Sequence, residues 1–158
     1  MPTIVKNIND LQKNINKRIA FAMKNTQKVI YNCIQESINS YYSERVFRGG
    51  TSCIPSEYER TYKLLNSLIK TDVVVKGDII SCEVKIDDNY LNYIYPDNGG
   101  TRATGLDVIT WNEQDGSHGG TISGNVRLWS DAMDSLKGEN GIVSIFVNNL
   151  KKSGINIS

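Results

Sequence analysis

The sequence predicts an α+β fold in a single domain spanning residues 1–158. Its expected parts are a long N-terminal helix, a second capped helix, a small antiparallel sheet of three to four strands, a glycine-rich loop and C-terminal helices. Three patterns predict this order: steps of three and four between apolar residues in the first forty positions, apolar–polar alternation over residues 78–87, and helical spacing after residue 126. A length of 158 residues suits one domain with a moderate core.

Residues 1–47 are expected to form one long amphipathic helix, because no proline or glycine occurs between Thr3 and Arg48. About 38 helical residues would span about 57 Å, while a compact domain of this size has a radius of gyration near 15 Å, so one end should overhang and be covered by a partner chain. The stripe along one face consists of Ile4, Ile8, Leu11, Ile15, Ile19, Ala22, Thr26, Val29, Cys33, Ser37 and Tyr41.

The second helix is expected over residues 55–70. Ser56 is a good N-cap, and Glu59, three residues later, completes a capping box. We expect Arg60 and Lys63 to face solvent or a neighbouring subunit. The side chains expected to face inward are Tyr58, Tyr62, Leu65, and Leu68 or Ile69.

The antiparallel sheet is expected within residues 71–111. Two β-branched runs on either side of Gly77 predict a hairpin. The alternation of Ile80, Cys82, Val84 and Ile86 with Ser81, Glu83 and Lys85 predicts one buried and one wet face. Further strands are expected over residues 90–95 and around Leu106–Trp111.

A flexible loop is expected over residues 112–125, since residues 96–125 hold seven of the thirteen glycines. Helical spacing then predicts helices and a tail over residues 126–158. Lys151 and Lys152 before Gly154 are typical of the C-terminal end of a helix.

The composition, 39% hydrophobic and 22% charged, is that of an ordinary globular protein. No apolar run approaches the ~18 residues of a membrane span, and the lysine- and asparagine-containing start argues against a secretory leader. Three widely spaced cysteines predict no disulfide framework and synthesis in a reducing compartment. We therefore expect no membrane association.

The charge is uneven along the chain. Residues 1–42 hold six lysines and arginines against Asp10 and Glu36. A basic helix of this kind favours contact with nucleic acid or an acidic partner, and the simpler interpretation is a solvated polar face.

No catalytic, cofactor-binding or metal-binding pattern emerges. His118, with Ser117 and Asp115, lies in a glycine-rich segment that does not hold a nucleophile and base at ~3 Å, so a hydrolase built on it is the weakest hypothesis. The cysteines and His118 lack the short paired spacings of a zinc site, and the three Gly-Gly-Thr sequences do not form a phosphate-binding loop. We expect no enzymatic activity and no cofactor.

The order of motifs resembles the small neck proteins of tailed bacteriophages, the tail-completion or head–tail joining (tail terminator-like) family. The resemblance rests on Tyr41-Tyr42-Ser43, the Tyr58-x-Arg60-Thr61 helix and the ending Leu150-Lys151-Lys152-Ser153-Gly154-Ile155. The chain departs from the family at Tyr93-x-Tyr95-Pro96, where many members have an aromatic-Gly-Thr turn.

The resemblance implies a non-enzymatic structural protein of the virion, made in the host bacterial cytoplasm. Its copies would form a homo-oligomeric ring, six-fold by analogy, between neck or connector proteins and the tail tube, with DNA passing through. The residues expected at subunit or partner contacts are Ile8, Leu11, Ile15, Lys17, Arg18, Arg60, Lys63, Tyr95, Arg102, Trp111 and His118. The alternative is a small nucleic-acid-binding or regulatory protein that uses the basic N-terminal helix.

Overall fold

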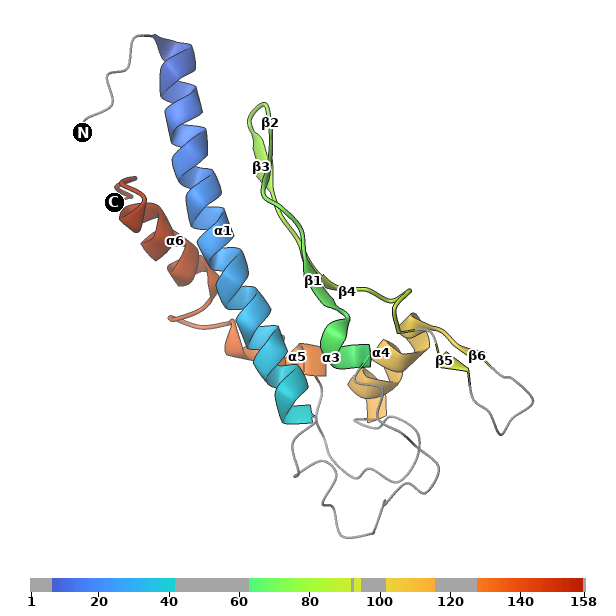
Figure 1. Ribbon diagram of the computed structural model, residues 1–158. Helices are drawn as coiled ribbons and strands as arrows, with labels where there is room; N and C mark the ends of the chain where they lie inside the picture. Colours follow the sequence, from blue (N-terminus) through green and yellow to red (C-terminus); the bar gives the residue numbers. More distant parts are fainter. Residues whose placement is uncertain (1–6, 42–62, 92, 95–101, 116–127, 158) are drawn as a thin grey trace. The chain divides into compact units, whose positions relative to one another are not determined.

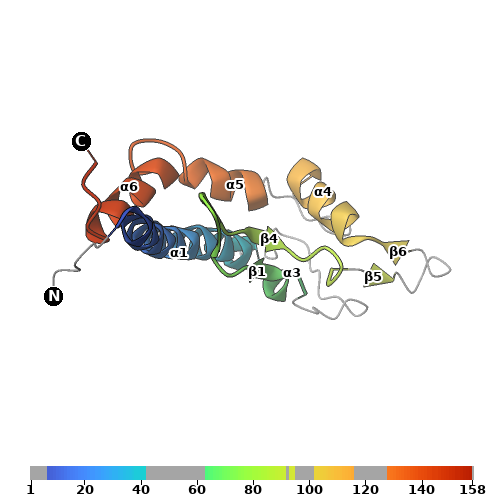
Figure 2. The same ribbon diagram turned by 90° about the horizontal axis from the view of Figure 1, so that it is seen from above.

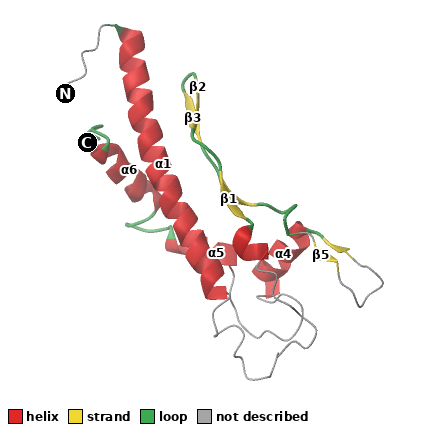
Figure 3. Cartoon of the chain, viewed as in Figure 1, coloured by secondary structure: helices red, strands yellow, loops and turns green. Residues whose placement is uncertain are grey.

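A computed structural model describes residues 7–41, 63–91, 93–94, 102–115 and 128–157 of the chain. It confirms the α+β class, with a run of short antiparallel strands between the N-terminal and the C-terminal helices (Figure 1, Figure 3). The contacts divide the chain into two compact units. Unit 1 comprises residues 1–30, 70–84 and 136–158, and unit 2 comprises residues 31–69 and 85–135.

The long helix predicted at the N-terminus is confirmed as α1 (Ile8–Tyr41). Asn7 precedes it, and its side-chain oxygen accepts a 2.9 Å hydrogen bond from the backbone N–H of Asp10, which satisfies one of the free donors of the first turn. The acidic Asp10 also lies at the positive end of the helix dipole. The helix thus begins at a local N-terminal signal, and residues 42–47 of the prediction lie outside the described residues.

In unit 1, the hairpin of β2 (Val74–Lys76) and β3 (Ile79–Ser81) confirms the turn predicted at Gly77. Gly77 has a φ of 59°, which a glycine adopts without strain and which the tight turns of two-residue hairpins require. The strands are antiparallel, with Val75 opposite Ile80 and Lys76 opposite Ile79. The predicted alternation is also confirmed, because Ile80, Cys82, Val84 and Ile86 are half-buried and the residues between them are exposed.

The base of this hairpin is held by one buried amide of α1. Gln27 donates from Nε2 to the carbonyl oxygens of Thr71 at 2.8 Å and Glu83 at 2.9 Å. The Glu83 N–H is satisfied instead by the Thr71 hydroxyl, at 2.8 Å. The Glu83 carbonyl oxygen also accepts from the Thr71 N–H at 3.0 Å, so Gln27 adds a second donor there and gives a donor to the Thr71 carbonyl oxygen.

The hairpin tip is tied to α1 in the same way. Asn16 donates to the Gly77 carbonyl oxygen at 3.2 Å, and Gln12 donates to the Asp78 carboxylate. Three polar side chains of α1 therefore follow the hairpin from its base to its turn.

The other helix of unit 1, α6 (Ile142–Lys152), packs along a different face of α1 (Figure 1, Figure 2). Its Asn149 amide donates to the Thr26 hydroxyl at 3.1 Å, and both residues are buried. The predicted end of this helix at a glycine is confirmed. Gly154 has a φ of 86°, and the N–H groups of Gly154 and Ile155 donate to the carbonyl oxygens of Lys151 and Leu150, respectively.

In unit 2, the last turns of α1 contact α5 (Leu128–Ser135), one of the two predicted C-terminal helices. Ser37 donates to the Leu128 carbonyl oxygen at 2.7 Å, and the Cys33 sulfur lies 2.8 Å from the Ser135 hydroxyl. Ile34 and Ile38 are fully buried there. The stripe predicted through Val29, Cys33 and Ser37 was therefore displaced by one residue, because the buried face in this half follows i, i+4 steps from Ala22.

The second helix predicted over residues 55–70 is wrong at its end. The described helix α3 (Lys63–Asn66) stops at Ser67, whose hydroxyl donates to the Leu64 carbonyl oxygen at 2.7 Å. Residues 68–70 form β1 (Leu68–Lys70), which pairs with β4 (Val84–Ile86). Pairing with a β-branched partner overrides the weak helical spacing of Leu65 and Leu68. Residues 55–62, with the Ser56 cap, lie outside the described residues.

The strand predicted around Leu106–Trp111 is also wrong, because these residues belong to α4 (Gly105–Asp115). Thr104 and Asp107 form a reciprocal capping box in which the Thr104 N–H donates to the Asp107 carboxylate at 2.8 Å and the Asp107 N–H donates to the Thr104 hydroxyl at 3.2 Å. Gly105 is packed so closely against Asp88 that a Cβ there would overlap the Asp88 carbonyl oxygen. This start signal prevails over the β-propensity of the following residues.

Within the described ranges, the strands form three two-stranded sheets in place of one sheet of three to four strands. The third pair is β5 (Tyr93–Ile94) with β6 (Arg102–Ala103). In unit 1 the cover of the hairpin comes from α1 and not from a further strand. Residues 116–125 of the predicted flexible loop lie outside the described residues.

Unit 2 also contains a cap between helices. The Glu113 carboxylate of α4 accepts hydrogen bonds from the Trp129 N–H, the Ser130 N–H at 3.2 Å and the Ser130 hydroxyl at 2.6 Å. A carboxylate at the positive end of α5 is favourable for the helix dipole. Glu113 therefore joins α4 to α5, the next described helix along the chain.

Candidate interaction surfaces

The apolar stripe of α1 in unit 1 becomes exposed toward its N-terminal end. The exposed fraction is 0% for Ala22, 40% for Ile15, 45% for Leu11 and 81% for Ile8. The reason is the end of α6: the Gly154 carbonyl oxygen after its last turn accepts a 2.7 Å hydrogen bond from Arg18, one turn before Ala22. From Arg18 toward the N-terminus of α1 the apolar stripe continues, but α6 has already ended and does not cover it.

These three apolar residues lie at steps of three and four on one face of α1. Two of them are isoleucine and one is leucine, the residue types that pack between paired helices. The structure therefore brings together Ile8, Leu11 and Ile15, which the sequence singled out for partner contact. Whether a partner covers them stays a prediction.

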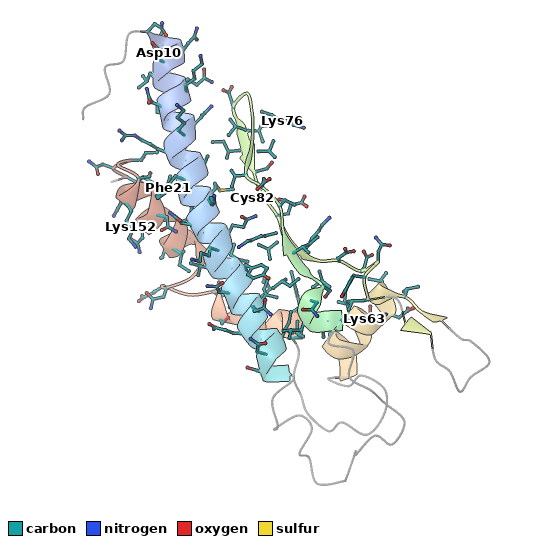
Figure 4. The ribbon with its side chains drawn as sticks, viewed as in Figure 1. Asp10, Phe21, Lys63, Lys76, Cys82 and Lys152 are labelled. Atoms are coloured by element: carbon teal, nitrogen blue, oxygen red, sulfur yellow. The ribbon has the colours of Figure 1, made fainter. Side chains whose placement is uncertain are left out.

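The basic residues of α1 form a second surface. Lys13, Lys17, Lys24 and Lys28 are all exposed, and their spacings of four, seven and four residues place them on one helical face. Phe21 lies on α1 between Lys17 and Lys24 and is 54% exposed (Figure 4). Arg18 is exposed as well, but its guanidinium is used in the bond to Gly154.

The other residues expected at contacts are not gathered with this helix. Lys63 is half-buried in α3. Arg102 pairs with Ile94 in the β5–β6 ladder, and Trp111 belongs to α4. Arg60, Tyr95 and His118 lie outside the described residues.

The hairpin carries an apolar surface that the sequence analysis missed. Val74, Val75 and Ile79 are 42%, 46% and 70% exposed. The signal was available, since three consecutive valines between Asp72 and Lys76 offer apolar side chains to both faces of a ribbon.

The described titratable groups show few features of a reactive or metal-binding site. Within the described ranges no cluster of three or more His, Cys, Asp or Glu side chains could hold a metal ion. Burial raises the pKa of the Cys82 thiol, which keeps it protonated and unreactive at neutral pH. The hydrogen bonds from the hydroxyl and N–H of Thr104 lower the pKa of Asp107, as its capping role requires.

Among the helices that the structure describes, none combines the length and the apolar character needed to cross a bilayer. The exposed residues of α1 and of the hairpin make these two surfaces the candidates for binding a partner.

Comparison with known protein families gives a match over most of the chain. The model of the YomN family matches residues 7–152, which includes α1 and every later described element up to the end of α6. Neither the curated proteins nor the solved structures gave a significant match. Because the match covers most of the chain, this protein belongs to the YomN family, a family derived from Bacillus phages.

Proposed function

We propose that the protein is a structural component of a tailed phage or phage-like particle, and that its copies form an oligomeric ring at the neck or the top of the tail. The phage-derived family supports the setting. The motif order, from the Tyr58-x-Arg60-Thr61 sequence to the closing Leu150-Lys151-Lys152 helix end, supports the joining role.

The observation that carries the proposal is the uncovered end of the α1 stripe. Burying an apolar side chain contributes about 1.5–3 kcal/mol, so exposed isoleucine and leucine in a row are best explained by a protein partner. Three residues are too few for a stable interface by themselves, since specific interfaces bury about 800 Å² on each partner. The ring would therefore assemble from several weak contacts and depend on concentration or on docking to a neighbour.

The test is the double substitution Ile8→Ser with Leu11→Ser in a phage or prophage that carries the gene. We expect normal synthesis of the protein but few infectious particles, with heads and tails accumulating unjoined in electron micrographs. The matched control is Ile142→Ser with Val143→Ser, at exposed apolar residues on α6. Particles that lack the protein by mass spectrometry, or full infectivity of the double variant, would contradict the proposal.

A second candidate function, nucleic-acid binding, is favoured by the four lysines and Phe21 on α1. Lysines that neutralise phosphates make binding fall steeply with salt, and an exposed aromatic ring can stack on a base. We expect this function, if it holds, to give single-stranded or duplex DNA binding at low salt that is lost on changing Lys13, Lys17, Lys24 and Lys28 to glutamate. Absence of DNA binding at 20 mM salt, measured by fluorescence anisotropy, would remove it.

A further inference from the structure

We infer that the outer edge of β2 is a self-complementary pairing site, at which the segment Asp72–Lys76 of one copy adds antiparallel to the same segment of a second copy about a two-fold axis. The inference goes beyond the proposed ring, because it is a symmetric contact between two copies and uses none of the residues proposed for the ring. The hairpin of unit 1 carries it.

The edge of β2 is open among the described residues. The sheet contains only β2 and β3, so each strand has one paired and one unpaired edge. The α1 helix does not close the edge of β2, since Gln27 contacts the carbonyl groups of Thr71 and Glu83 on the two sides of the hairpin base and Asn16 contacts the turn. A helix that contacts both sides of the base and the turn lies across a face of the ribbon.

The hydrogen-bonding groups of this edge can be assigned from the register. Lys76 and Ile79 flank the two-residue turn and close the hairpin, so their N–H and C=O groups face one another. Directions alternate along a strand, so the groups of Val74 face Ser81 in β3 and those of Val75 face outward. The pairing that we infer extends β2 by one residue, which turns the groups of Val73 outward as well.

This assignment allows one two-fold register in particular. If Val74 is opposite Val74 of the second copy, then Val73 is opposite Val75 in both directions, and the outward groups of these residues meet as hydrogen-bonded pairs. The central pair is then a non-hydrogen-bonded pair, in which the two Val74 side chains lie close together, with Cβ atoms about 4.5–5.5 Å apart.

The charges agree with the same register. Asp72 of each copy falls opposite Lys76 of the other, so two opposite-charge pairs flank the three valine pairs. Asp72 and Lys76 are both exposed, and Lys76 lies near the tip of the hairpin (Figure 4). Charged residues on an edge strand commonly prevent pairing, but here their order, acid first and base last, favours antiparallel pairing of identical strands.

Pairing would also bury side chains that are now exposed. Val74 and Val75 are nearly half exposed in the single chain. A two-stranded ribbon is marginally stable in water, and pairing two ribbons gives a four-stranded sheet. The chemistry of the edge therefore specifies a second copy of this chain as its occupant.

The first test uses disulfide formation at the symmetry axis, in the full-length chain with Cys33, Cys53 and Cys82 replaced by alanine. Val74→Cys places two thiols opposite one another in a non-hydrogen-bonded pair, whose Cα separation of about 4.5 Å lies within the range of about 4.4–6.8 Å that a disulfide spans. Val75→Cys is the matched control on the same strand, because its partner in the second copy is Val73. With oxidised glutathione as the oxidant, we expect Val74→Cys to form covalent dimers at least tenfold faster than Val75→Cys. Equal rates would overturn the inference.

The second test keeps the native cysteines and exchanges the charges. Asp72→Lys and Lys76→Asp each place like charges opposite one another twice per dimer, and we expect each to weaken dimerisation roughly tenfold in sedimentation experiments. The double variant restores both pairs with reversed sign and should return to within about threefold of the original affinity. A protein that stays monomeric at millimolar concentration, or a double variant as weak as the single ones, contradicts the inference.

The two proposals fail separately. The substitutions at Ile8 and Leu11 leave the edge of β2 intact, so they should reduce particle assembly and leave the Val74→Cys dimer unchanged. If the dimer is absent and Ile8 and Leu11 still prove essential, only the pairing site is excluded.

Discussion

At the scale of single residues, the most consequential side chain is Gln27, a buried polar group of α1. The residue is 5% exposed, and its amide donates to the carbonyl oxygens of Thr71 and Glu83 on two different segments. A buried acceptor without a partner costs about 1–3 kcal/mol, more than a typical hydrogen bond contributes on balance. The residue therefore fixes where the hairpin meets α1 in unit 1.

The substitution Gln27→Leu should lower the free energy of unfolding by about 1–3 kcal/mol, because the Thr71 carbonyl oxygen loses its donor from α1, while the Glu83 carbonyl oxygen keeps the Thr71 N–H. Urea denaturation followed by circular dichroism measures it. Asn16→Leu is the control on the same face of α1, with one bond at 3.2 Å near the solvent-exposed turn, and it should change stability by less than about 1 kcal/mol. Equal effects of both substitutions would show that Gln27 has no special role.

At the scale of elements, the start of α4 shows how a local signal decides between helix and strand. Residues 106–111 are rich in β-formers, yet the Thr104–Asp107 capping box begins a helix there. The close approach of Gly105 to the Asp88 carbonyl group adds a packing reason that no other residue type could meet. Capping and packing together outweigh strand propensity at this position.

The same capping box predicts a dependence on pH. Since the folded pKa of Asp107 is lower than in the unfolded chain, its contribution to stability is present above the unfolded value of about 3.9 and is lost as the pH falls through the folded value. We expect α4 to lose order in acid below about pH 4. Carboxyl chemical shifts of Asp107, followed by NMR during titration, measure the pKa.

The matched variant is Thr104→Val, which removes the hydroxyl and keeps the shape of the side chain. It should raise the pKa of Asp107 toward its ordinary value, while the Thr104 N–H bond retains part of the shift. An unchanged titration in this variant would mean that the hydroxyl bond does not hold the carboxylate.

At the scale of the whole molecule, the α1 helix carries both buried and exposed apolar residues. Ile34 and Ile38 on α1 are fully buried in unit 2, while Ile8 and Leu11 are exposed in unit 1. The helix runs through both units, with its first part packed on α6 and the hairpin and its last part on α5. Apolar character alone therefore does not say whether a position belongs to the core or to a binding surface.

This difference gives a prediction for the isolated protein. Ile34→Ala should reduce the free energy of unfolding by about 2–5 kcal/mol, because it leaves a cavity in a packed core. Leu11→Ala should change it by less than about 0.5 kcal/mol, as expected of an exposed site. Thermal or urea denaturation at low protein concentration separates the two. A large loss of stability in Leu11→Ala would show that the stripe is covered within one chain.

Several features of the fold follow from the sequence because their causes are local. The long helix needs only the absence of proline and glycine and a steady apolar spacing, and the hairpin turn needs Gly77. The end of α6 needs basic residues and a glycine that accepts a positive φ. Each signal lies within a few residues of the structure that it determines, so it can be recognised without the rest of the chain.

The remaining features were decided by tertiary contacts between distant residues. The sequence does not reveal that Gln27 serves two carbonyl groups more than forty positions away, that Asp88 excludes a side chain at Gly105, or that Leu68 pairs as a strand. The exposure of Ile8, Leu11 and Ile15 likewise depends on where α6 ends. The sequence alone determined a helix with an apolar stripe, and the tertiary structure decided which part of that stripe is core, because burial depends on which partner lies opposite.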